Sequence, residues 1–242
     1  MSTESDLRDE MVEVGKRLYF RNLVAACDGN ISARLGPDAI LVTPSGVSKG
    51  YFSAQDILKV DLEGRPIGGP GKPTREISMH LGIFAARPDV NGIVHAHPPT
   101  ATAFGCTERR FDNVLLPEVV FELGAIAVSE YALPTTEAVT RSILKVLDAG
   151  TNAVVLANHG AVTMGPSVLQ AYYNMETLEA VARVTAIAEQ IGTPRYLTSA
   201  QLTELRNLIA PPIKPHQSLL SRADAELVES VVAEVVRRLS GN

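Results

Sequence analysis

The alternation of short strand-like runs with longer helix-like segments is the feature that most constrains the fold of this chain. In the helix-like segments apolar residues recur every three or four positions, the spacing of a stripe that packs against a core. This spacing predicts helices over residues 4–25, from near Thr74, and over 101–104, 137–147, 168–191, 198–209 and 223–239. Runs rich in β-branched residues predict strands over 39–43, 57–61, 91–97 and 125–129, and two more within 151–165, broken at 158–160. Helices that precede, separate and follow such strands indicate an α/β protein with helices on both faces of one sheet, a three-layer α/β/α arrangement.

Neither a linker nor an internal repeat divides the 242 residues. A chain of this length can bury one substantial apolar core. We therefore expect a single domain over residues 1–242, with a helical C-terminal tail at about 210–242. The strongest loop signal is GRPIGGPGKP, which leads into the helix that begins near Thr74, and Thr74 is the expected N-cap.

Charge and cysteine content exclude several classes of protein. The net charge of −5 gives no general attraction to nucleic acid or to an anionic membrane. Cys27 and Cys106 are too few for a disulfide framework. The N-terminal segment is charged throughout, and no later segment approaches the roughly 18 apolar residues of a membrane span. We expect a cytoplasmic protein without a nucleic-acid or membrane partner.

Two of the five histidines stand one residue apart in the strand-like run NGIVHAHPP. Residues i and i+2 of a strand point to the same face, so His95 and His97 form a chelating pair. A zinc site normally needs a third protein ligand, and the best candidate is His159 in the sequence ANHG, ahead of His80 and His216. A single histidine beside apolar residues is more often a hydrogen-bonded core or surface residue. HxH together with NHG favours zinc, and other divalent metals stay open.

Glu76 lies in the first turn of a predicted helix, with His80 one turn later on the same face. An acid at this position commonly complements the helix dipole, which is the simpler interpretation. A helix that packs back on the strand it precedes would return Glu76 toward His95 and His97. The order of loop, acid and histidine strand therefore favours a functional carboxylate.

Three short segments offer exposed backbone N–H groups and hydroxyl or amide donors. They are DGNIS at 28–32, TPSG at 43–46, and Thr74 with Arg75 at a helix N-terminus. Each is typical of an ordinary turn when taken alone. Together, ahead of the histidines, they indicate a site for a phosphate group.

The succession GNIS, TPSG, PTRE with a histidine four residues after its Glu, HAHP and NHG resembles the class II aldolase/adducin family. The resemblance covers roughly residues 7–195, and the joint pattern is specific although no single piece is. It implies a central, largely antiparallel sheet between helices, one Zn²⁺ per subunit, and a homotetramer with active sites at subunit interfaces.

Carried over residue by residue, the resemblance implies that His95, His97 and His159 are the zinc ligands and that Glu76 is the catalytic acid/base. The positions that it implies for phosphate or substrate binding are Gly29, Asn30, Ser45, Gly46, Thr74 and Arg75. Arg75 departs from the family's fuculose-phosphate enzyme, which has a small hydroxyl residue there, but a cation suits an anionic ligand.

The implied activity is a zinc-dependent aldolase that reversibly cleaves a ketose 1-phosphate to dihydroxyacetone phosphate and an aldehyde. The ketose would be fuculose 1-phosphate-like or a deoxypentulose or methylthiopentulose phosphate. Zinc would stabilise the developing enediolate as a Lewis acid, and Glu76 would remove the proton from dihydroxyacetone phosphate in the aldol direction.

The match fails at the aldehyde end of the substrate, where the fuculose-phosphate enzyme uses tyrosines. The segment LLPEVVFELG offers Glu118 and Glu122 instead, Tyr131 is not at the proton-donor position, and no tyrosine follows Tyr196. The identity of the aldehyde and of a second acid/base is therefore open.

Other activities fit the same pattern. A sugar-phosphate 4-epimerase and a zinc-dependent dehydratase or decarboxylase would use the same residues. A non-catalytic adducin-like module is disfavoured because all three histidines are present. A zinc hydrolase of the HxHxDH type is disfavoured because HAH is followed by Pro98, Pro99 and Thr100.

Overall fold

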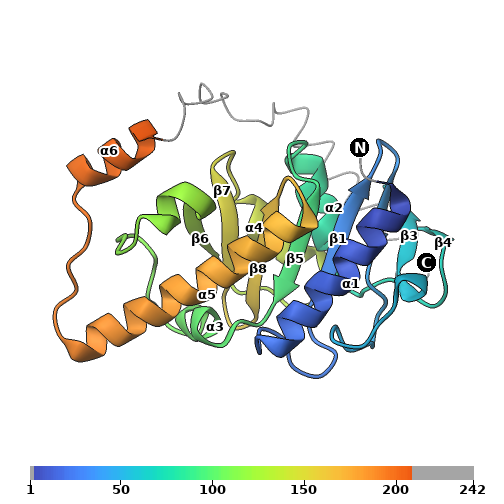
Figure 1. Ribbon diagram of the computed structural model, residues 1–242, viewed down its shortest axis with the longest axis horizontal. Coiled ribbons are helices and arrows are strands. Elements are labelled where there is room, and N and C mark those ends of the chain that lie inside the picture. Colours follow the sequence, from blue (N-terminus) through green and yellow to red (C-terminus); the bar gives the residue numbers. More distant parts are fainter. Residues whose placement is uncertain (1–2, 209–242) are drawn as a thin grey trace.

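The computed structural model describes residues 3–208 and is built of helices on either side of a sheet (Figure 1). Its strands are β1 (Asn30–Leu35), β2 (Ala39–Val42), β3 (Leu58–Asp61), β4 (Pro66–Gly68), β5 (Gly92–Ala96), β6 (Ala125–Ser129), β7 (Thr151–Leu156) and β8 (Gly160–Gly165). Its α-helices are α1 (Glu4–Phe20), α2 (Ile77–Ala86), α3 (Pro99–Gly105), α4 (Glu137–Leu144), α5 (Val168–Ile191) and α6 (Ser199–Leu208). A 3₁₀ turn, η1 (Ala54–Asp56), and a π-helical turn, η2 (Val119–Leu123), complete the elements. The predicted helix at 223–239, the predicted tail and His216 lie outside the described residues.

The eight strands form one sheet in the order β4-β3-β2-β1-β5-β8-β7-β6. Every neighbouring pair is antiparallel except β6 and β7, which are parallel. The expected α/β class with a largely antiparallel central sheet is therefore confirmed. Within the described part of the chain, no helix has the length and apolar character needed to cross a membrane.

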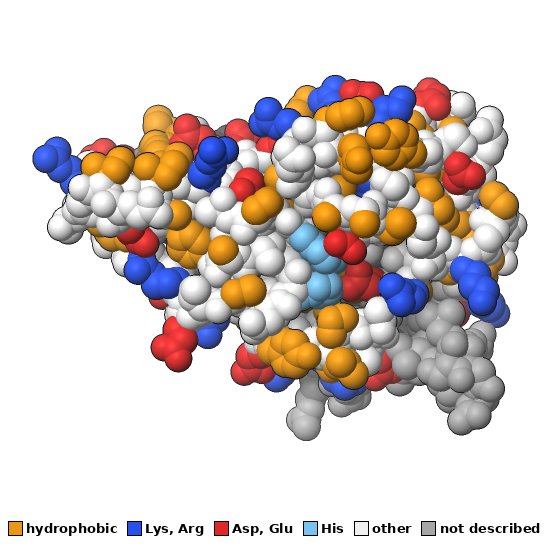
Figure 2. Space-filling view, turned by 90° about the horizontal axis from the view of Figure 1, so that it is seen from below, with side chains coloured by type: hydrophobic (Ala, Val, Ile, Leu, Met, Phe, Trp, Pro, Cys, Tyr) orange, Lys and Arg blue, Asp and Glu red, His pale blue; other side chains and the backbone are white. Residues whose placement is uncertain are grey.

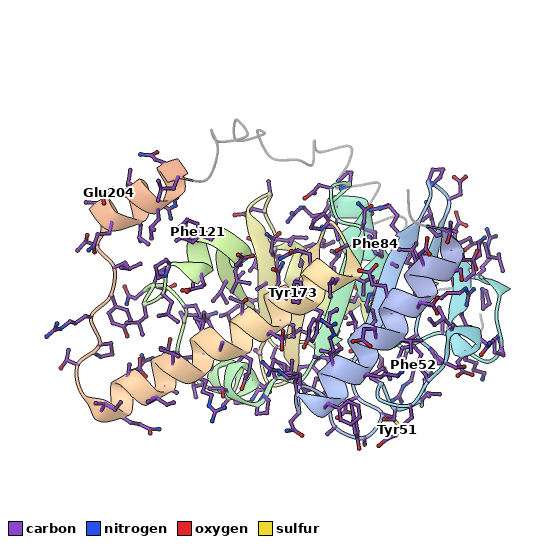
Figure 3. The ribbon with its side chains drawn as sticks, in the orientation of Figure 1. Tyr51, Phe52, Phe84, Phe121, Tyr173 and Glu204 are labelled. Carbon is purple, nitrogen blue, oxygen red and sulfur yellow. The ribbon has the colours of Figure 1, made fainter. Side chains whose placement is uncertain are left out.

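Two separate apolar cores lie on the two faces of the sheet, as the three-layer prediction requires. One core joins the sheet to α1, α3 and α5 and includes Phe52, whereas the other joins it to α2 and α4 and includes Phe84. Figure 3 places Phe52 beside α1 in the front layer and Phe84 near α2 behind the sheet. Helices therefore cover both faces.

Strand β5 lies in the middle of the sheet and sends alternate side chains to the two cores. Val94 and Ala96 belong to the core under α1 and α5, and Ile93 belongs to the core under α2 and α4. Because strand side chains alternate between faces, His95 shares the face of Ile93, toward α2. On either side of β5, His95 is paired with Asn30 in β1 and with Val162 in β8.

Four expected boundaries or elements were wrong, and one of them is the loop expected at 64–73, which contains the short strand β4. The first helix ends at Phe20, not near residue 25, and β1 occupies residues expected to form a loop. Strand β1 forms because β2 and β5 supply hydrogen-bonding partners on both of its edges.

Helix α2 begins at Ile77 with Glu76 at the N-cap, so Thr74 is not the N-cap. The amide of Thr74 donates instead to the carbonyl of Thr43, which ties this residue to the end of β2. Helix α2 begins only after this hydrogen bond between Thr74 and Thr43, so Glu76 lies at the N-terminus of the helix.

Candidate metal and substrate site

The side chains of His95, His97 and His159 meet at one end of the central strands. One nitrogen from each ring lies within 4.8 Å of the others, and the ring centroids are 4.9–5.3 Å apart. His97 follows β5 directly, and His159 lies in the turn between β7 and β8. Pairing of β5 with β8 brings these two segments together. Figure 2 shows histidine side chains at the surface beside acidic side chains, with hydrophobic side chains around them, although His95 itself is fully buried.

Hydrogen bonds fix the orientation of His95. Its Nδ1 lies 2.9 Å from the carbonyl oxygen of Ala161. A carbonyl only accepts, so Nδ1 carries the proton and Nε2 keeps its lone pair. That Nε2 atom is buried and has no hydrogen-bond partner. This is the arrangement of a histidine that binds a metal through Nε2.

His97 is held from the opposite side of the cluster. Its backbone N–H donates to the carbonyl of Leu23, and its Nδ1 lies 3.5 Å from Oδ2 of Asp28. Its Nε2 is also buried without a partner. A carboxylate behind a histidine commonly orients the ring toward a metal.

The turn that carries His159 depends on two unusual backbone positions. Asn158 has a φ of 55°, in the left-handed region that asparagine tolerates better than most residues. The next turn residue, His159, donates its N–H to the carbonyl of Leu156. At Gly160 an added Cβ would lie 2.5 Å from Cδ2 of His97, so only glycine lets the ring of His97 approach this closely.

The carboxylate of Glu76 completes the cluster from the start of α2. Its two oxygens lie 3.3 Å from Nε2 of His95 and 3.4 Å from Nε2 of His159. Asn30 donates to Oε2 at 2.8 Å, and Oε1 is buried without a partner. Burial raises the pKa of Glu76, but His95 and the hydrogen bond from Asn30 help to lower it by more, so this pKa lies below its ordinary value.

Burial lowers the pKa of His95, His97 and His159 below the ordinary histidine value. The lowered pKa values favour the neutral rings, whose nitrogen lone pairs are the groups that bind a metal. Buried polar atoms without partners are costly, by about 1–3 kcal/mol each. Three such atoms, on His95, His97 and Glu76, converge here, and a divalent cation would satisfy all of them. The donor set thus fits a metal ion, with three imidazoles of the type that suits zinc.

A cavity of about 160 Å³ opens beside the cluster. It is lined by Cys27, Asp28, Gly29, Asn30, Pro44, Ser45, Gly46, Lys49, Thr74, Arg75, Glu76, His97, Pro134, Thr135 and His159. All six positions expected to bind phosphate or substrate are in this lining. At Gly29, whose φ is +73°, an added Cβ would lie 2.7 Å from the carbonyl oxygen of His95, so the loop can pass this close only as glycine.

Several residues of the lining were not among the expected ones. Asp28 lies in the quoted loop DGNIS, but nothing in that motif pointed to a contact with His97. Lys49 is buried, and its Nζ donates to the carbonyls of Val47 and Cys27, which ties two loops of the lining together. Pro134 and Thr135 reach the cavity from the segment after β6, which only the fold reveals.

The structure does not bring the residues considered for the aldehyde end to this cavity. Glu118, Glu122 and Tyr131 are absent from its lining, and Tyr131 is 61% exposed. His80 is fully buried behind Glu76 and hydrogen-bonded at both ring nitrogens. It is therefore not part of the ligand set.

Comparisons with known proteins bear on the family of this chain. Residues 9–186 match the family described as "Class II Aldolase and Adducin N-terminal domain". The 3-oxo-tetronate 4-phosphate decarboxylase of Escherichia coli O6:H1 is 32% identical over 208 residues, which cover 84% of this chain and 97% of the relative. The L-fuculose phosphate aldolase of Methanococcus maripaludis (strain DSM 14266) is 32% identical over 182 residues, which cover 75% of this chain and 97% of the relative.

Solved structures give the same result. YgbL from Klebsiella pneumoniae, described as an aldolase, epimerase or decarboxylase, superposes with a TM-score of 0.80 at 33% identity, over 85% of this chain and all of that one. An L-fuculose 1-phosphate aldolase superposes with a TM-score of 0.77 at 26% identity, over 86% of this chain and 98% of that one.

Proposed function

The chain belongs to the class II aldolase and adducin family, and on that premise we propose that it is a zinc-dependent aldolase. It reversibly cleaves a ketose 1-phosphate to dihydroxyacetone phosphate and an aldehyde. The substrate class is that of fuculose 1-phosphate and of deoxypentulose or methylthiopentulose phosphates. Each subunit holds one zinc ion.

The observation that carries the proposal is the placement of Glu76 against the three histidines. A buried carboxylate oxygen without a partner lies 3.4 Å from His159, at the mouth of a cavity with anion-binding features. Ligand nitrogens on three imidazoles supply a metal site, and the carboxylate beside them supplies an acid/base. A purely structural histidine cluster would have its nitrogens paired with protein groups.

His95, His97 and His159 would hold the metal, which as a Lewis acid stabilises negative charge developing on the substrate oxygens. In cleavage the bond between C3 and C4 breaks and its electron pair passes to C3. The C4 hydroxyl gives its proton to the second acid/base, whose identity is open, and an equivalent proton passes through solvent to Glu76 as the aldehyde forms. Glu76 then delivers a proton to C3 of the resulting enediolate, which gives dihydroxyacetone phosphate. In the aldol direction Glu76 removes that proton.

The rest of the cavity suits the phosphate of such a substrate. Ser45 and Thr74 offer hydroxyl groups, Arg75 offers a cation, and the N-terminus of α2 opens onto the same space. The side chain of Asn30, in contrast, bonds to Glu76 and His80, so its main contribution is to the carboxylate.

A second candidate is decarboxylation of a 3-oxo sugar-acid phosphate, and one observation favours it. Among the described residues, no tyrosine lines the cavity. Aldol cleavage needs a group that accepts the hydroxyl proton, whereas a carboxylate leaves as CO₂ with no proton to remove. Both reactions give the same enediolate, which Glu76 would protonate, with a proton that in decarboxylation comes from solvent. Relatives named as decarboxylases match this chain over 84–85% of its length.

Product analysis distinguishes the candidates. The zinc-loaded protein is incubated with ketose 1-phosphates and, separately, with 3-oxo-tetronate 4-phosphate. Dihydroxyacetone phosphate is measured by coupled reduction with glycerol-3-phosphate dehydrogenase, and aldehyde and CO₂ are measured in parallel. Equimolar dihydroxyacetone phosphate and aldehyde support the aldolase. Dihydroxyacetone phosphate with CO₂ supports the decarboxylase, and an epimerised or dehydrated sugar phosphate without either product contradicts both.

We also infer from the family that the protein is a cytoplasmic homotetramer. Large apolar side chains such as Phe20, Tyr51, Tyr131 and Leu133 are more than 60% exposed in the single chain, which is consistent with burial between subunits. Light scattering coupled to size-exclusion chromatography measures the mass directly. A monomer at micromolar concentration would contradict this inference.

A further inference from the structure

A chain of three buried polar side chains runs behind Glu76, away from the cavity. Oγ of Ser32 lies 2.6 Å from Nδ1 of His80, and Nε2 of His80 lies 2.5 Å from Oδ1 of Asn30. Nδ2 of Asn30 then donates to Oε2 of Glu76 at 2.8 Å. Ser32 and His80 are fully buried and Asn30 is 3% exposed, so the two hydrogen bonds of His80 do not compete with bulk water.

The carboxylate of Glu76, at the end of the chain, sets the donor and the acceptor of each hydrogen bond. Asn30 donates from Nδ2 to Oε2 of Glu76, so its NH₂ group is turned toward the carboxylate. The carbonyl oxygen of Asn30 therefore faces His80, which must donate from Nε2. His80 then accepts at Nδ1, and the hydroxyl of Ser32 is the donor.

One strand and one helix supply these four groups and fix their spacing. Ser32 and Asn30 are two residues apart in β1, so their side chains share the face toward α2. His80 and Glu76 are four residues apart at the start of α2, one turn above each other. The Asn30 and Ser32 side chains of β1 therefore alternate with those of Glu76 and His80 from α2. A rotation of the Glu76 side chain would break its hydrogen bond from Asn30.

We propose that Ser32, His80 and Asn30 form a one-way hydrogen-bond chain that positions Glu76, with one carboxylate oxygen held by Asn30 and the other left to exchange a proton with substrate. This inference rests on the proposed role of Glu76 as acid/base. His80 is a positioning residue, since it touches neither the cavity nor the histidine cluster. The chain needs a neutral imidazole, and burial lowers the pKa of His80 to about 3, so it is neutral at pH 7.

The test measures exchange of the C3 proton of dihydroxyacetone phosphate in zinc-loaded variants. His80→Phe keeps a planar ring but removes the donor to Asn30, whose amide is then free to turn. Because a hydrogen bond to a charged group contributes about 1.5–3 kcal/mol, the exchange rate constant should fall by about 10- to 100-fold. The KM for dihydroxyacetone phosphate and the zinc content should stay at the wild-type values.

Three further variants separate positioning from a structural role. His80→Gln retains a neutral amide donor and should recover much of the rate. Ser32→Ala removes the far end of the chain and should give a smaller loss with normal folding. Ser78→Ala, a buried serine of α2 outside the chain, should have no effect on the rate. An unchanged rate constant in His80→Phe, or an equal loss in His80→Phe and His80→Gln, would overturn the proposal.

A spectroscopic measurement tests the chain independently of the reaction. Nitrogen chemical shifts of the ¹⁵N-labelled histidine side chains report which ring nitrogen carries the proton. We expect a neutral Nε2–H tautomer for His80 that does not titrate across neutral pH. An Nδ1–H tautomer would overturn the chain even in an active enzyme. Absence of proton exchange in the wild type, with the Nε2–H tautomer present, would count against the proposed function alone.

Discussion

Gly160→Ala provides a quantitative test of how the histidine cluster is held. An added Cβ would lie 2.5 Å from Cδ2 of His97 and 2.6 Å from the carbonyl oxygen of Ala96, where ordinary contacts are 3.4–4 Å. The ring of His97 and the end of β5 must therefore move away from the β7–β8 turn by about 1 Å. A metal site tolerates deviations of only about 0.2 Å in its ligand distances.

Two effects of different size follow from this displacement. Overpacking should lower the free energy of unfolding of the metal-free protein by about 1–3 kcal/mol, and each kcal/mol lowers the midpoint of thermal unfolding by about 2–4 °C. Displacement of one ligand should weaken zinc binding by about 10- to 100-fold. At a fixed free zinc concentration that saturates the wild type, a 100-fold loss removes a further 2.7 kcal/mol or so of stability.

Zinc affinity is measured by competition with a chromophoric chelator, and thermal unfolding is followed with and without zinc. Gly192→Ala is the matched control, because an added Cβ there meets nothing within 4 Å and the φ of Gly192 is 174°, an extended value open to any residue. The reasoning would be refuted by a Gly160→Ala variant that binds zinc as tightly as wild type and loses the same stability in the metal-free and metal-loaded forms.

Three further predictions concern the acid/base, the ligand support and the buried histidine. Glu76→Gln should bind zinc normally but lose about 10²- to 10⁴-fold in proton exchange with dihydroxyacetone phosphate, since a neutral amide cannot act as the base; normal exchange would assign the base elsewhere. Asp28→Ala removes the carboxylate 3.5 Å from His97 and should weaken zinc binding by about 10- to 100-fold, whereas Asp38→Ala in the exposed β1–β2 turn should not. His80 has a folded-state pKa of about 3 against 6.5 when unfolded, so the unfolded chain binds the extra proton and stability falls as pH drops below 6.5. The free energy of unfolding falls by about 1.4 kcal/mol per pH unit. Urea unfolding of the metal-free protein at pH 7 and pH 5 should therefore show a larger fall in this free energy for wild type than for His80→Gln. An equal fall in both proteins would contradict a buried neutral His80.

Strands and helices with a clear pattern of apolar residues were predictable from the sequence. The run AILV became β2 and the β-rich run before residue 61 became β3, while the long apolar stripe after Ser167 became α5 with the predicted bounds. Strand β3 and helix α5 bury one face whose spacing matches their own geometry, and β2 is an apolar run buried at every position. Their local pattern and their tertiary environment therefore agree.

Strands without such a pattern were missed for a physical reason. NISARL in β1 carries Ser32 and Arg34 and follows a glycine loop, yet it lies in the centre of the sheet. It is a strand because two neighbours satisfy its backbone and because His80 satisfies the buried hydroxyl of Ser32. The three residues of β4 are largely exposed and form only because β3 lies beside them. Neither cause can be read from local composition.

The candidate site divides in the same way. The spacing HAH, the glycine after His159 and the acid ahead of α2 were visible in the sequence, because chelation and close backbone approach require particular residue types at short range. The contact between Asp28 and His97, the cavity wall from Pro134 and Thr135, and the chain from Ser32 to Glu76 depend on which strands are neighbours. The sequence by itself determined the residue types of the candidate site. Only the tertiary structure decided how they are oriented, since orientation comes from hydrogen bonds and packing between segments that are far apart along the chain.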